Sequence, residues 1–304
     1  MPGGQRRSRL VELVAVAALG LASNAYAQSS EFRFFVSVVD PASGTPVTAL
    51  TPADIVVTED NAAGRVLEIE PIDWPVKVAI LVDNDTGAVD RLVPMRSGLT
   101  GLIDALPDGV EISLVATAPQ PRTVVKPTTD KQKLREGVDR IAPGPEAGRF
   151  VDGLIETAQR FEKERGNYFP VIVALGSLSA EGSPVREYEA NKMLRTLGER
   201  AATVHAVMLA ADGRSPTGGN YQTQVGLAAT KGTGGRYESI AAASRLSTLL
   251  PEIGAQVARS HALQSHQFRV TLERPNKKSG AMGVLSIKTT GGQLPKLSID
   301  GHLP

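Results

Sequence analysis

The most informative segment of this chain is Val76-Lys77-Val78-Ala79-Ile80-Leu81-Val82-Asp83-Asn84-Asp85-Thr86-Gly87. Its first part is apolar except for Lys77, and such a run is typical of a strand that is buried on both faces of a parallel sheet. The run ends at Asp83 and Asp85, so two carboxylates are expected at the carboxyl end of a central strand. Asp, Asn and Gly are also common turn residues, so this composition alone does not require a ligand.

Beyond this segment, helical and strand patterns alternate along the chain. Strands separated by helices of ten or more residues predict a parallel sheet with right-handed crossovers and helices on both faces. The sequence therefore predicts a doubly wound α/β domain over residues 76–262. Its expected helices are 92–106, 131–141, 150–164, 184–200 and 243–262, and its expected strands after the first are 111–116, 171–175 and 203–209.

The two ends of the chain show a different pattern, in which apolar and polar residues alternate as in half-buried strands. Residues 54–59 and 66–72 are interpreted as a hairpin around Asn61-Ala62-Ala63-Gly64, and residues 268–272 and 284–288 as two later strands. Neither set alone has enough strands to bury a face. We therefore expect residues 28–75 and 263–304 to form one small β-domain together, with Trp74-Pro75 at the junction to the α/β domain.

Residues 1–27 have the pattern of a secretory signal peptide. Arg6, Arg7 and Arg9 precede an apolar run, and Ala25-Tyr26-Ala27 supplies small residues for cleavage. The apolar run is shorter than the roughly 20 residues that span a bilayer, and no later stretch is long and apolar enough to do so. The sequence therefore predicts an exported protein, periplasmic or secreted, with no membrane span in the mature chain.

The composition excludes several classes of function. Among 304 residues, 41% are hydrophobic and 21% charged, as in soluble globular proteins, and Cys is absent, which removes disulfides, thiol nucleophiles and Cys-ligated zinc. The formal net charge is +1, and loss of the three Arg and one Glu of residues 1–27 would make it −1. Without a basic patch, no nucleic acid partner is expected.

The central segment resembles the first element of a von Willebrand factor type A domain, in which an Asp-x-Ser-x-Ser turn after a strand holds a divalent cation. The segment Leu227-Ala228-Ala229-Thr230, together with Thr233-Gly234-Gly235-Arg236-Tyr237, resembles the stretch that leads into the last core strand of that family. The phrase from Pro46 to Asp60 resembles the region ahead of the A domain in a group of exported bacterial proteins. The resemblance spans roughly residues 33 to 290, and it implies recognition of a protein or extracellular ligand at the top of the sheet.

The metal ligands of that family are mostly replaced. Asp83 is retained, but Asp85 and Gly87 stand where the two Ser residues would be. No Ser or Thr occurs between Thr129 and Thr157, where the family has a Thr, and the third loop, Gly176-Ser177-Leu178-Ser179, lacks the expected Asp. Asp83 and Asp85 could still hold Mg²⁺ or Ca²⁺ weakly, since these ions accept carboxylate and water oxygens. We expect a degenerate metal site and no required cofactor.

Arg149 lies near the position of the missing Thr, and two hypotheses are open for it. Its guanidinium could pair with Asp83 or Asp85 and offset their charge, or it could be a solvated residue at the start of a helix. The residues expected to form the ligand-binding surface are Asp83, Asn84, Asp85, Thr86, Arg149 and Ser177.

Three functions are compatible with these features. The first is an exported, non-enzymatic binding protein that recognises its ligand largely without metal. The second is a phosphatase, because a strand that ends in Asp-x-Asp resembles the opening motif of haloacid dehalogenase-type enzymes, with Asp83 as nucleophile and Asp85 as acid or base. Against it, Thr86-Gly87 reverses the usual Gly-Thr. The third is a structural module that acts through its β-domain.

Overall fold

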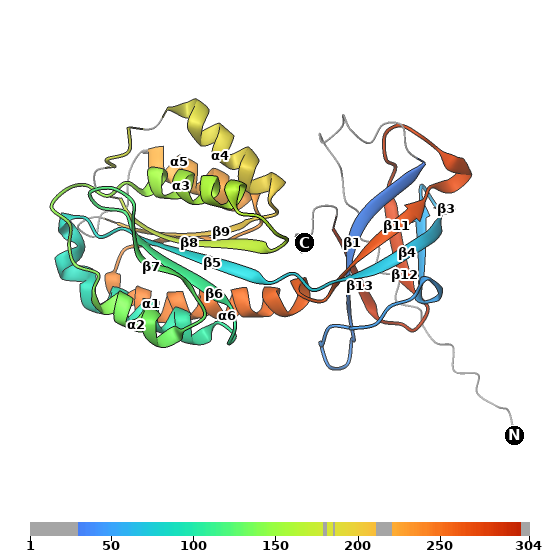
Figure 1. Cartoon of the computed structure of the whole chain (residues 1–304), viewed down its shortest axis with the longest axis horizontal. Helices are drawn as coiled ribbons and strands as arrows, with labels where there is room; N and C mark the ends of the chain where they lie inside the picture. The colour runs from blue at the N-terminus through green and yellow to red at the C-terminus, as the bar shows by residue number, and fades with distance from the viewer. Residues whose placement is uncertain (1–29, 179–180, 185, 211–220, 299–304) are drawn as a thin grey trace, which may run out of the picture. The chain divides into compact units, whose positions relative to one another are not determined.

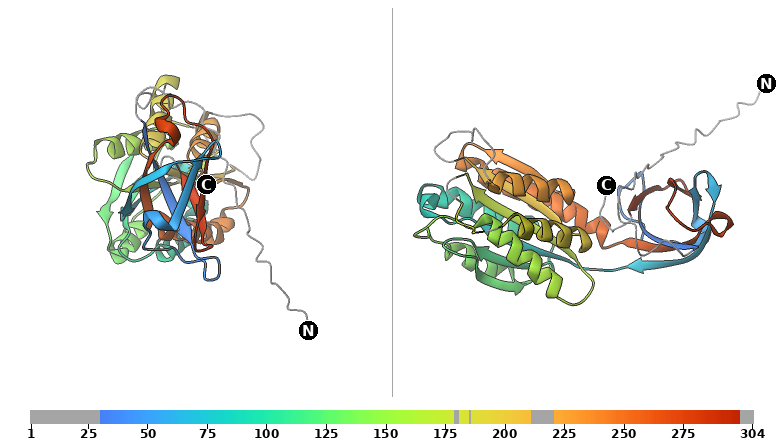
Figure 2. Two further views of the ribbon diagram at one scale, coloured as in Figure 1. Left: turned by 90° about the vertical axis from the view of Figure 1, so that its right-hand side faces the viewer. Right: turned by 90° about the horizontal axis from the view of Figure 1, so that it is seen from above.

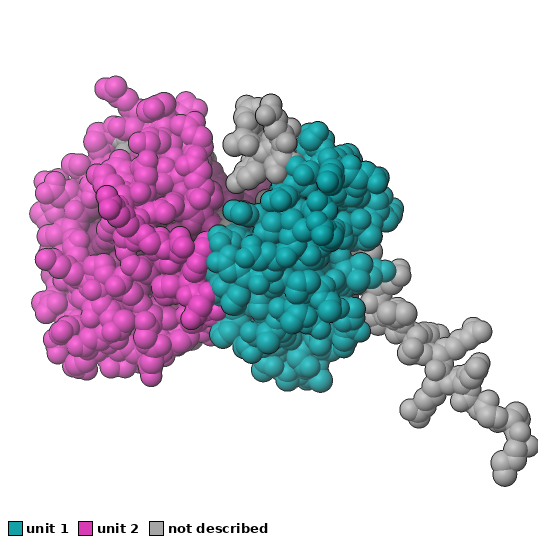
Figure 3. All heavy atoms as spheres, turned by 45° about the vertical axis from the view of Figure 1, so that its right-hand side comes forward, with its two compact units in different colours: residues 1–72, 266–304 teal, residues 73–265 magenta. Residues whose placement is uncertain are grey.

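A computed structural model of the chain describes residues 30–178, 181–184, 186–210 and 221–298, and these divide into two compact units. One unit is made of residues from both ends of the chain, up to Ile72 and from His266 onward, and the other spans Asp73–Ser265 (Figure 3). The predicted signal peptide, residues 1–27, lies outside the described residues. Within them, no helix has both the length and the apolar character needed to cross a bilayer.

The larger unit is a six-stranded sheet in the order β10-β9-β8-β5-β6-β7, covered by helices on both faces (Figures 1 and 2). Its strands are parallel except β7, which pairs antiparallel with β6. The doubly wound α/β fold is therefore confirmed. The strands are β5 (Val76–Val82), β6 (Glu111–Ala116), β7 (Arg122–Thr128), β8 (Phe169–Ser177), β9 (Thr203–Leu209) and β10 (Tyr237–Ile240).

Helices α3, α4 and α5 cover one face of this sheet, and α1, α2 and α6 cover the other (Figure 1). Their bounds are α1 (Leu92–Ala105), α2 (Lys131–Asp139), α3 (Phe150–Lys163), α4 (Glu187–Glu199), α5 (Tyr221–Gly232) and α6 (Leu246–Gln264). The helices predicted in this unit are present with ends shifted by a few residues. Strand β7 was not predicted, because it is an edge strand with a Pro and with Val125 as its one buried side chain. Helix α5 is not among the helix ranges that the sequence analysis gave.

Central strand β5 is buried along its length except for Lys77, as its apolar run predicts. It lies between β8 and β6, and the order in which the chain adds strands reverses beside it. In doubly wound sheets, ligands bind at such a reversal, outside the carboxyl ends of the strands. The fold therefore places the turn after Val82 at the position where sheets of this kind bind ligands.

The smaller unit consists of two antiparallel sheets packed around a shared core. The four-stranded sheet has the order β13-β1-β11-β4, so strands from both ends of the chain pair with each other, as expected for the β-domain. The strands are β1 (Glu31–Val39), β2 (Ile55–Glu59), β3 (Ala62–Ala63), β4 (Arg65–Ile72), β11 (Gln267–Glu273), β12 (Leu285–Thr289) and β13 (Leu294–Ser298).

The hairpin predicted for residues 54–59 and 66–72 is wrong. Strand β2 turns back only into the two-residue β3, and β4 joins the other sheet by pairing with β11. The chain passes between the sheets at Gly64, where a Cβ atom would lie 2.7 Å from Cδ1 of Leu272. Local turn residues signalled a reversal of the chain, but the partner of β4 is set by a contact with a strand about 200 residues later.

A buried ion pair holds the smaller unit together. The guanidinium of Arg274 donates to both carboxylate oxygens of Glu59, at 2.9 and 2.5 Å, and to the carbonyl oxygens of Gly280 and Ala281. Both charged side chains are almost completely buried, at 2% and 1% exposed. The hydrogen bond from Arg274 lowers the pKa of Glu59 despite the opposing effect of burial. This pair joins β2 to the loop between β11 and β12.

Loss of one partner of this pair should destabilise the protein strongly. We expect Arg274→Met to lower the free energy of unfolding by about 3–5 kcal/mol, because Glu59 would be left charged and buried. Arg269→Met, which removes an ion pair with Glu70 that is partly exposed, should cost less than about 1 kcal/mol. Urea unfolding of both variants measures the difference, and equal losses would contradict this assignment.

Helices α1 and α6 approach closely at Gly98, where a Cβ atom would lie 2.4 Å from the carbonyl oxygen of Leu246. Gly98→Ala should therefore lower the free energy of unfolding by about 2 kcal/mol through overpacking. Gly198 in α4 has no atom within 4 Å of the same position, so Gly198→Ala should be neutral or stabilise by up to about 1 kcal/mol. The melting temperatures of the two variants test this close approach. Equal shifts in melting temperature would refute it.

Candidate functional site

The carboxyl ends of β5, β6 and β8 form one edge of the sheet, and the acidic turn lies at its centre. The backbone N–H of Asp83 donates to Leu175 in β8 at 2.9 Å, and the N–H of Thr117 after β6 donates to Val82 at 3.0 Å. The sheet pairing thus continues one residue beyond β5 on the side of β8 and one residue beyond β6 on the other side. Ser177, the last residue of β8, therefore lies beside Asp83 and Asp85.

The carboxylate of Asp83 is buried and fully engaged by protein donors. Its Oδ2 accepts hydrogen bonds from the backbone N–H of Ser177 at 3.0 Å and from the Ser177 hydroxyl at 2.7 Å. Its Oδ1 accepts from the backbone N–H of Asp85 at 3.1 Å. Burial, and then the charge of Asp85, raise the pKa of Asp83, while Ser177 and the charge of Arg91 act in the opposite direction.

Asp85 is held by a cation from its own loop. Arg91 ends the short helix η2 (Thr86–Arg91), and its Nη2 donates to Oδ1 of Asp85. The other oxygen, Oδ2, lies 2.8 Å from the Ser177 hydroxyl, so this hydroxyl lies between the two carboxylates. Both members of the ion pair are buried, with side chains 11% and 3% exposed. Arg91 is thus the countercharge of the acidic turn.

Asn84 fixes the neighbouring loops. Its side-chain oxygen accepts from the backbone N–H of Ala118 at 3.0 Å, and its side-chain nitrogen donates to the carbonyl oxygen of Ala142 at 2.7 Å. These bonds tie the turn after β5 to the loop after β6 and to the loop that precedes α3. With 3% of its surface exposed, Asn84 has a structural role here and is not free to contact a ligand.

The pairing proposed between Arg149 and the acidic turn is wrong. Arg149 directly precedes α3 and forms an ion pair with Asp152, in the first turn of that helix. The Nη1 atom of Arg149 lies 3.6 Å from Oδ2 of Asp152. The charge-compensating residue is Arg91, which the sequence analysis did not identify. A usable signal was its position six residues after Asp85 at the end of a short turn, but several Arg residues stand near the predicted edge and their spacing alone does not select one.

The six predicted surface residues therefore separate into two groups. Asp83, Asp85 and Ser177 form one buried, hydrogen-bonded cluster, and Asn84, also buried, bonds instead to the neighbouring loops. Thr86 is exposed at the start of η2, and Arg149 is partly exposed at the start of α3. Gln222 in α5 was also not predicted: it is buried, and its side-chain nitrogen donates to the carbonyl oxygen of Ser177 at 2.9 Å.

The donor set does not fit a divalent cation. One oxygen of Asp85 receives the guanidinium of Arg91, and the backbone of Gly148 lies so close to Asp83 that a Cβ there would be 2.0 Å from Oδ1. Gly148 also precedes Arg149, in the loop where the resemblance requires a Thr ligand. No group of three or more His, Cys, Asp or Glu residues with metal-binding geometry occurs in the described part of the chain.

The same contacts bear on the phosphatase hypothesis. A nucleophilic carboxylate needs an oxygen that can reach the substrate. Both oxygens of Asp83 accept hydrogen bonds from Ser177 or Asp85, and the residue is 5% exposed. This geometry does not favour nucleophilic attack by Asp83.

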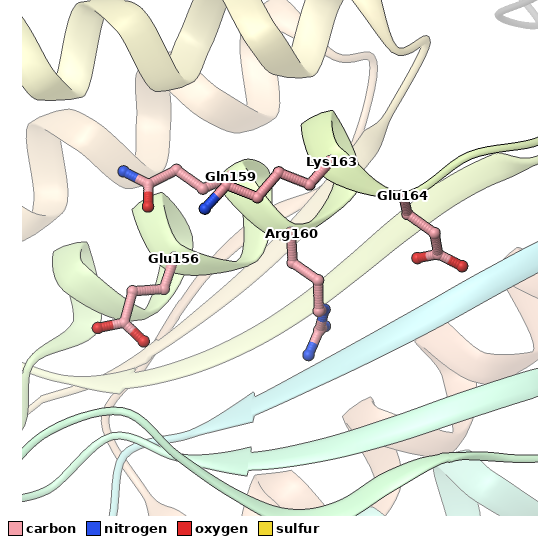
Figure 4. Close-up of a pocket in the computed structure, with 5 residues that line it drawn as sticks. All are labelled: Glu156, Gln159, Arg160, Lys163 and Glu164. Carbon is pink, nitrogen blue, oxygen red and sulfur yellow. The ribbon is translucent and has the colours of Figure 1, made fainter.

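An open groove runs along α3 at a different place from the acidic turn. It is lined by Glu156, Gln159, Arg160, Lys163 and Glu164 (Figure 4). Arg160 points toward the sheet and donates to the Ser113 hydroxyl of β6 at 3.2 Å. Glu164 forms an ion pair with Lys77, the second residue of β5, so the groove extends toward the amino ends of the strands. Acidic and basic side chains lie together along the groove, so its charge does not indicate a particular class of ligand.

Solved structures similar to this chain include proteins described as von Willebrand factor A domains. One, described as von Willebrand factor type A from Catenulispora acidiphila, matches 90% of this chain and 74% of its own at 12% identity and a TM-score of 0.50. BatB from Bacteroides thetaiotaomicron matches 62% of this chain and 100% of its own at 13% identity and a TM-score of 0.45. The vWF domain of the type V pili tip protein Mfa5 from Porphyromonas gingivalis matches 61% of this chain and 96% of its own at 10% identity and a TM-score of 0.43.

No protein-family model matches the sequence, and no curated protein matches it. The likeness therefore concerns the fold: the unit of residues 73–265 is a von Willebrand factor A-like α/β domain. This confirms the fold that the resemblance of the segment from Val76 to Gly87 implied.

His205 in β9 is a buried core histidine, 3% exposed. Its Nδ1 accepts a hydrogen bond from the backbone N–H of Arg236 at 3.2 Å, which requires that this nitrogen carry no proton. Burial, and then the charge of Arg236, lower the pKa of His205 from 6.5 to about 4. The imidazole is therefore neutral in the folded protein at physiological pH.

This depressed pKa predicts a loss of stability in acid. Above pH 6.5 the imidazole is neutral in both states, and between pH 6.5 and about 4 only the unfolded chain takes up the proton. Stability should therefore fall by up to about 3 kcal/mol as the pH is lowered through this range. Urea unfolding should show a smaller fall for His205→Asn, which keeps an acceptor near Arg236. Parallel pH profiles for the two proteins would contradict this prediction.

Proposed function

We propose that this protein is an exported, non-enzymatic binding protein that recognises a protein or other extracellular ligand at the carboxyl edge of its α/β sheet, without a divalent cation. Export rests on the signal-peptide pattern of residues 1–27. Recognition at this edge is supported by the strand order, which reverses beside β5.

One observation carries this proposal: large apolar side chains are exposed directly beside the closed acidic turn. Val89 in η2 is 63% exposed and Val93 in the first turn of α1 is 79% exposed. Tyr188, in the first turn of α4 at the same edge, is 70% exposed. Apolar and aromatic side chains supply most of the binding energy in protein interfaces, particularly when polar residues surround them.

The polar cluster supports this surface from beneath. Asp83, Asp85 and Ser177 are buried and bonded to one another, so they hold η2 and the end of β8 in place and do not themselves present free ligand-binding groups. The proposed contact surface therefore consists of Thr86, Val89, Val93 and Tyr188. Binding would depend on apolar contact and shape, and a metal would contribute little.

A change of apolar to charged side chains on this surface tests the proposal. We expect Val89→Asp/Val93→Asp to weaken capture of a partner from the exported fraction at least about tenfold, because two exposed apolar contacts would become charged. The matched control is Leu227→Asp in α5, which is 46% exposed and lies outside the proposed surface. Circular dichroism confirms that each variant is folded before capture is measured.

Equal capture by the double variant and the wild type would overturn this surface. A wash with EDTA should leave the captured partner bound, whereas loss with EDTA and recovery with Mg²⁺ or Ca²⁺ would show that recognition depends on a cation. Turnover of a generic aryl phosphate that is abolished by Asp83→Asn would replace the binding proposal with the phosphatase.

A further inference from the structure

The strongest unexplained feature of the molecule is that the acidic turn contains its own cation. Helix η2 begins directly after Asp85, and its first turn is closed by a hydrogen bond of 3.0 Å from the N–H of Ala88 to the carbonyl oxygen of Asp85. The helix therefore returns the side chain of Arg91 toward Asp85, which immediately precedes η2. Its guanidinium then meets Oδ1 of Asp85 in a buried position.

The cluster requires a positive charge. Asp83 and Asp85 both contact the single hydroxyl of Ser177, at 2.7 and 2.8 Å, so two carboxyl groups share a small buried volume. A third acidic group lies nearby: burial, and to a smaller extent the charge of Asp83, raise the pKa of Glu181. Buried carboxylates that repel each other are costly unless a cation lies close to them. Among the described residues, the cation that acts on Asp83 and pairs with Asp85 is Arg91.

The position of this guanidinium explains why a metal ion does not fit. Arg91 takes up an oxygen of Asp85, and Gly148 closes the space beside Oδ1 of Asp83. Gly87 lies beside this ion pair, where a Cβ atom would make ordinary contact with Oδ1 of Asp85, at 3.4 Å, and with Nη1 of Arg91, at 3.6 Å.

We propose that the guanidinium of Arg91 replaces a divalent cation at this edge of the sheet, so that the chain itself supplies the charge that holds the turns after β5 and β8 together. Without Arg91, the oxygen of Asp85 that now receives the guanidinium would bind Mg²⁺ or Ca²⁺, while Gly148 still closes the space beside Oδ1 of Asp83. The inference rests on contacts within the chain and is independent of any partner.

The test is the melting temperature of purified Arg91→Gln with EDTA and with about 10 mM MgCl₂ or CaCl₂. In EDTA we expect the variant to melt roughly 10 °C below the wild type, because Asp85 loses its partner. Divalent cation should raise the melting temperature of the variant by about 4 °C if its dissociation constant is about 1 mM. The wild type should not respond.

Arg149→Gln is the matched control, since it removes a nearby guanidinium whose ion pair is with Asp152. It should melt close to the wild type and be equally indifferent to cations. A melting temperature of Arg91→Gln equal to that of the wild type, or the same cation-induced rise in both, would overturn the proposal. So would an Arg91→Gln variant that is destabilised but gains nothing from either cation.

A double variant covers the case in which Arg91→Gln does not fold in EDTA. Asp85→Asn/Arg91→Gln removes both charges of the pair, so it should fold, melt above Arg91→Gln and show no response to Mg²⁺ or Ca²⁺. If the double variant is no more stable than the single one, the role of Arg91 is packing and not charge replacement, and the proposal fails.

Discussion

Two carboxylates are buried side by side at the end of the central strand, and the structure of this edge depends on how their charge is neutralised. Asp83 and Asp85 share the hydroxyl of Ser177, and the guanidinium of Arg91 pairs with Asp85. These contacts connect β5, β8 and η2 at one point. Because the cluster is buried, water competes little for these hydrogen bonds. They therefore hold the three elements in a fixed arrangement.

A similar solution appears in the smaller unit, where Arg274 and Glu59 form a buried pair of two hydrogen bonds. There the guanidinium also binds two backbone carbonyl groups and so fixes a loop between strands of different sheets. Arg suits both places because its planar group makes several directed hydrogen bonds and stays charged when buried. Each unit thus contains a buried Arg–carboxylate pair that fixes a segment between two of its secondary-structure elements.

The proposed function follows from the contrast between the buried cluster and its surroundings. The polar groups at the carboxyl edge of the sheet bind one another, and the exposed residues beside them include Val89, Val93 and Tyr188. In doubly wound sheets, ligands bind at the edge where the strand order reverses, and here that reversal lies beside β5. Here the edge would present apolar side chains above a buried acidic cluster whose charge is compensated by Arg91.

The sequence by itself determined the α/β class, because buried parallel strands and amphipathic helices leave periodic patterns that do not depend on distant partners. It also placed Asp83 and Asp85 at the end of β5, since a strand's end is visible where the apolar run stops. Only the tertiary structure decided that Arg91, and not Arg149, compensates them, and that β4 pairs with β11 instead of β2. These choices depend on which side chains and strands meet in space, and residues far apart in the chain leave no local pattern that records their meeting.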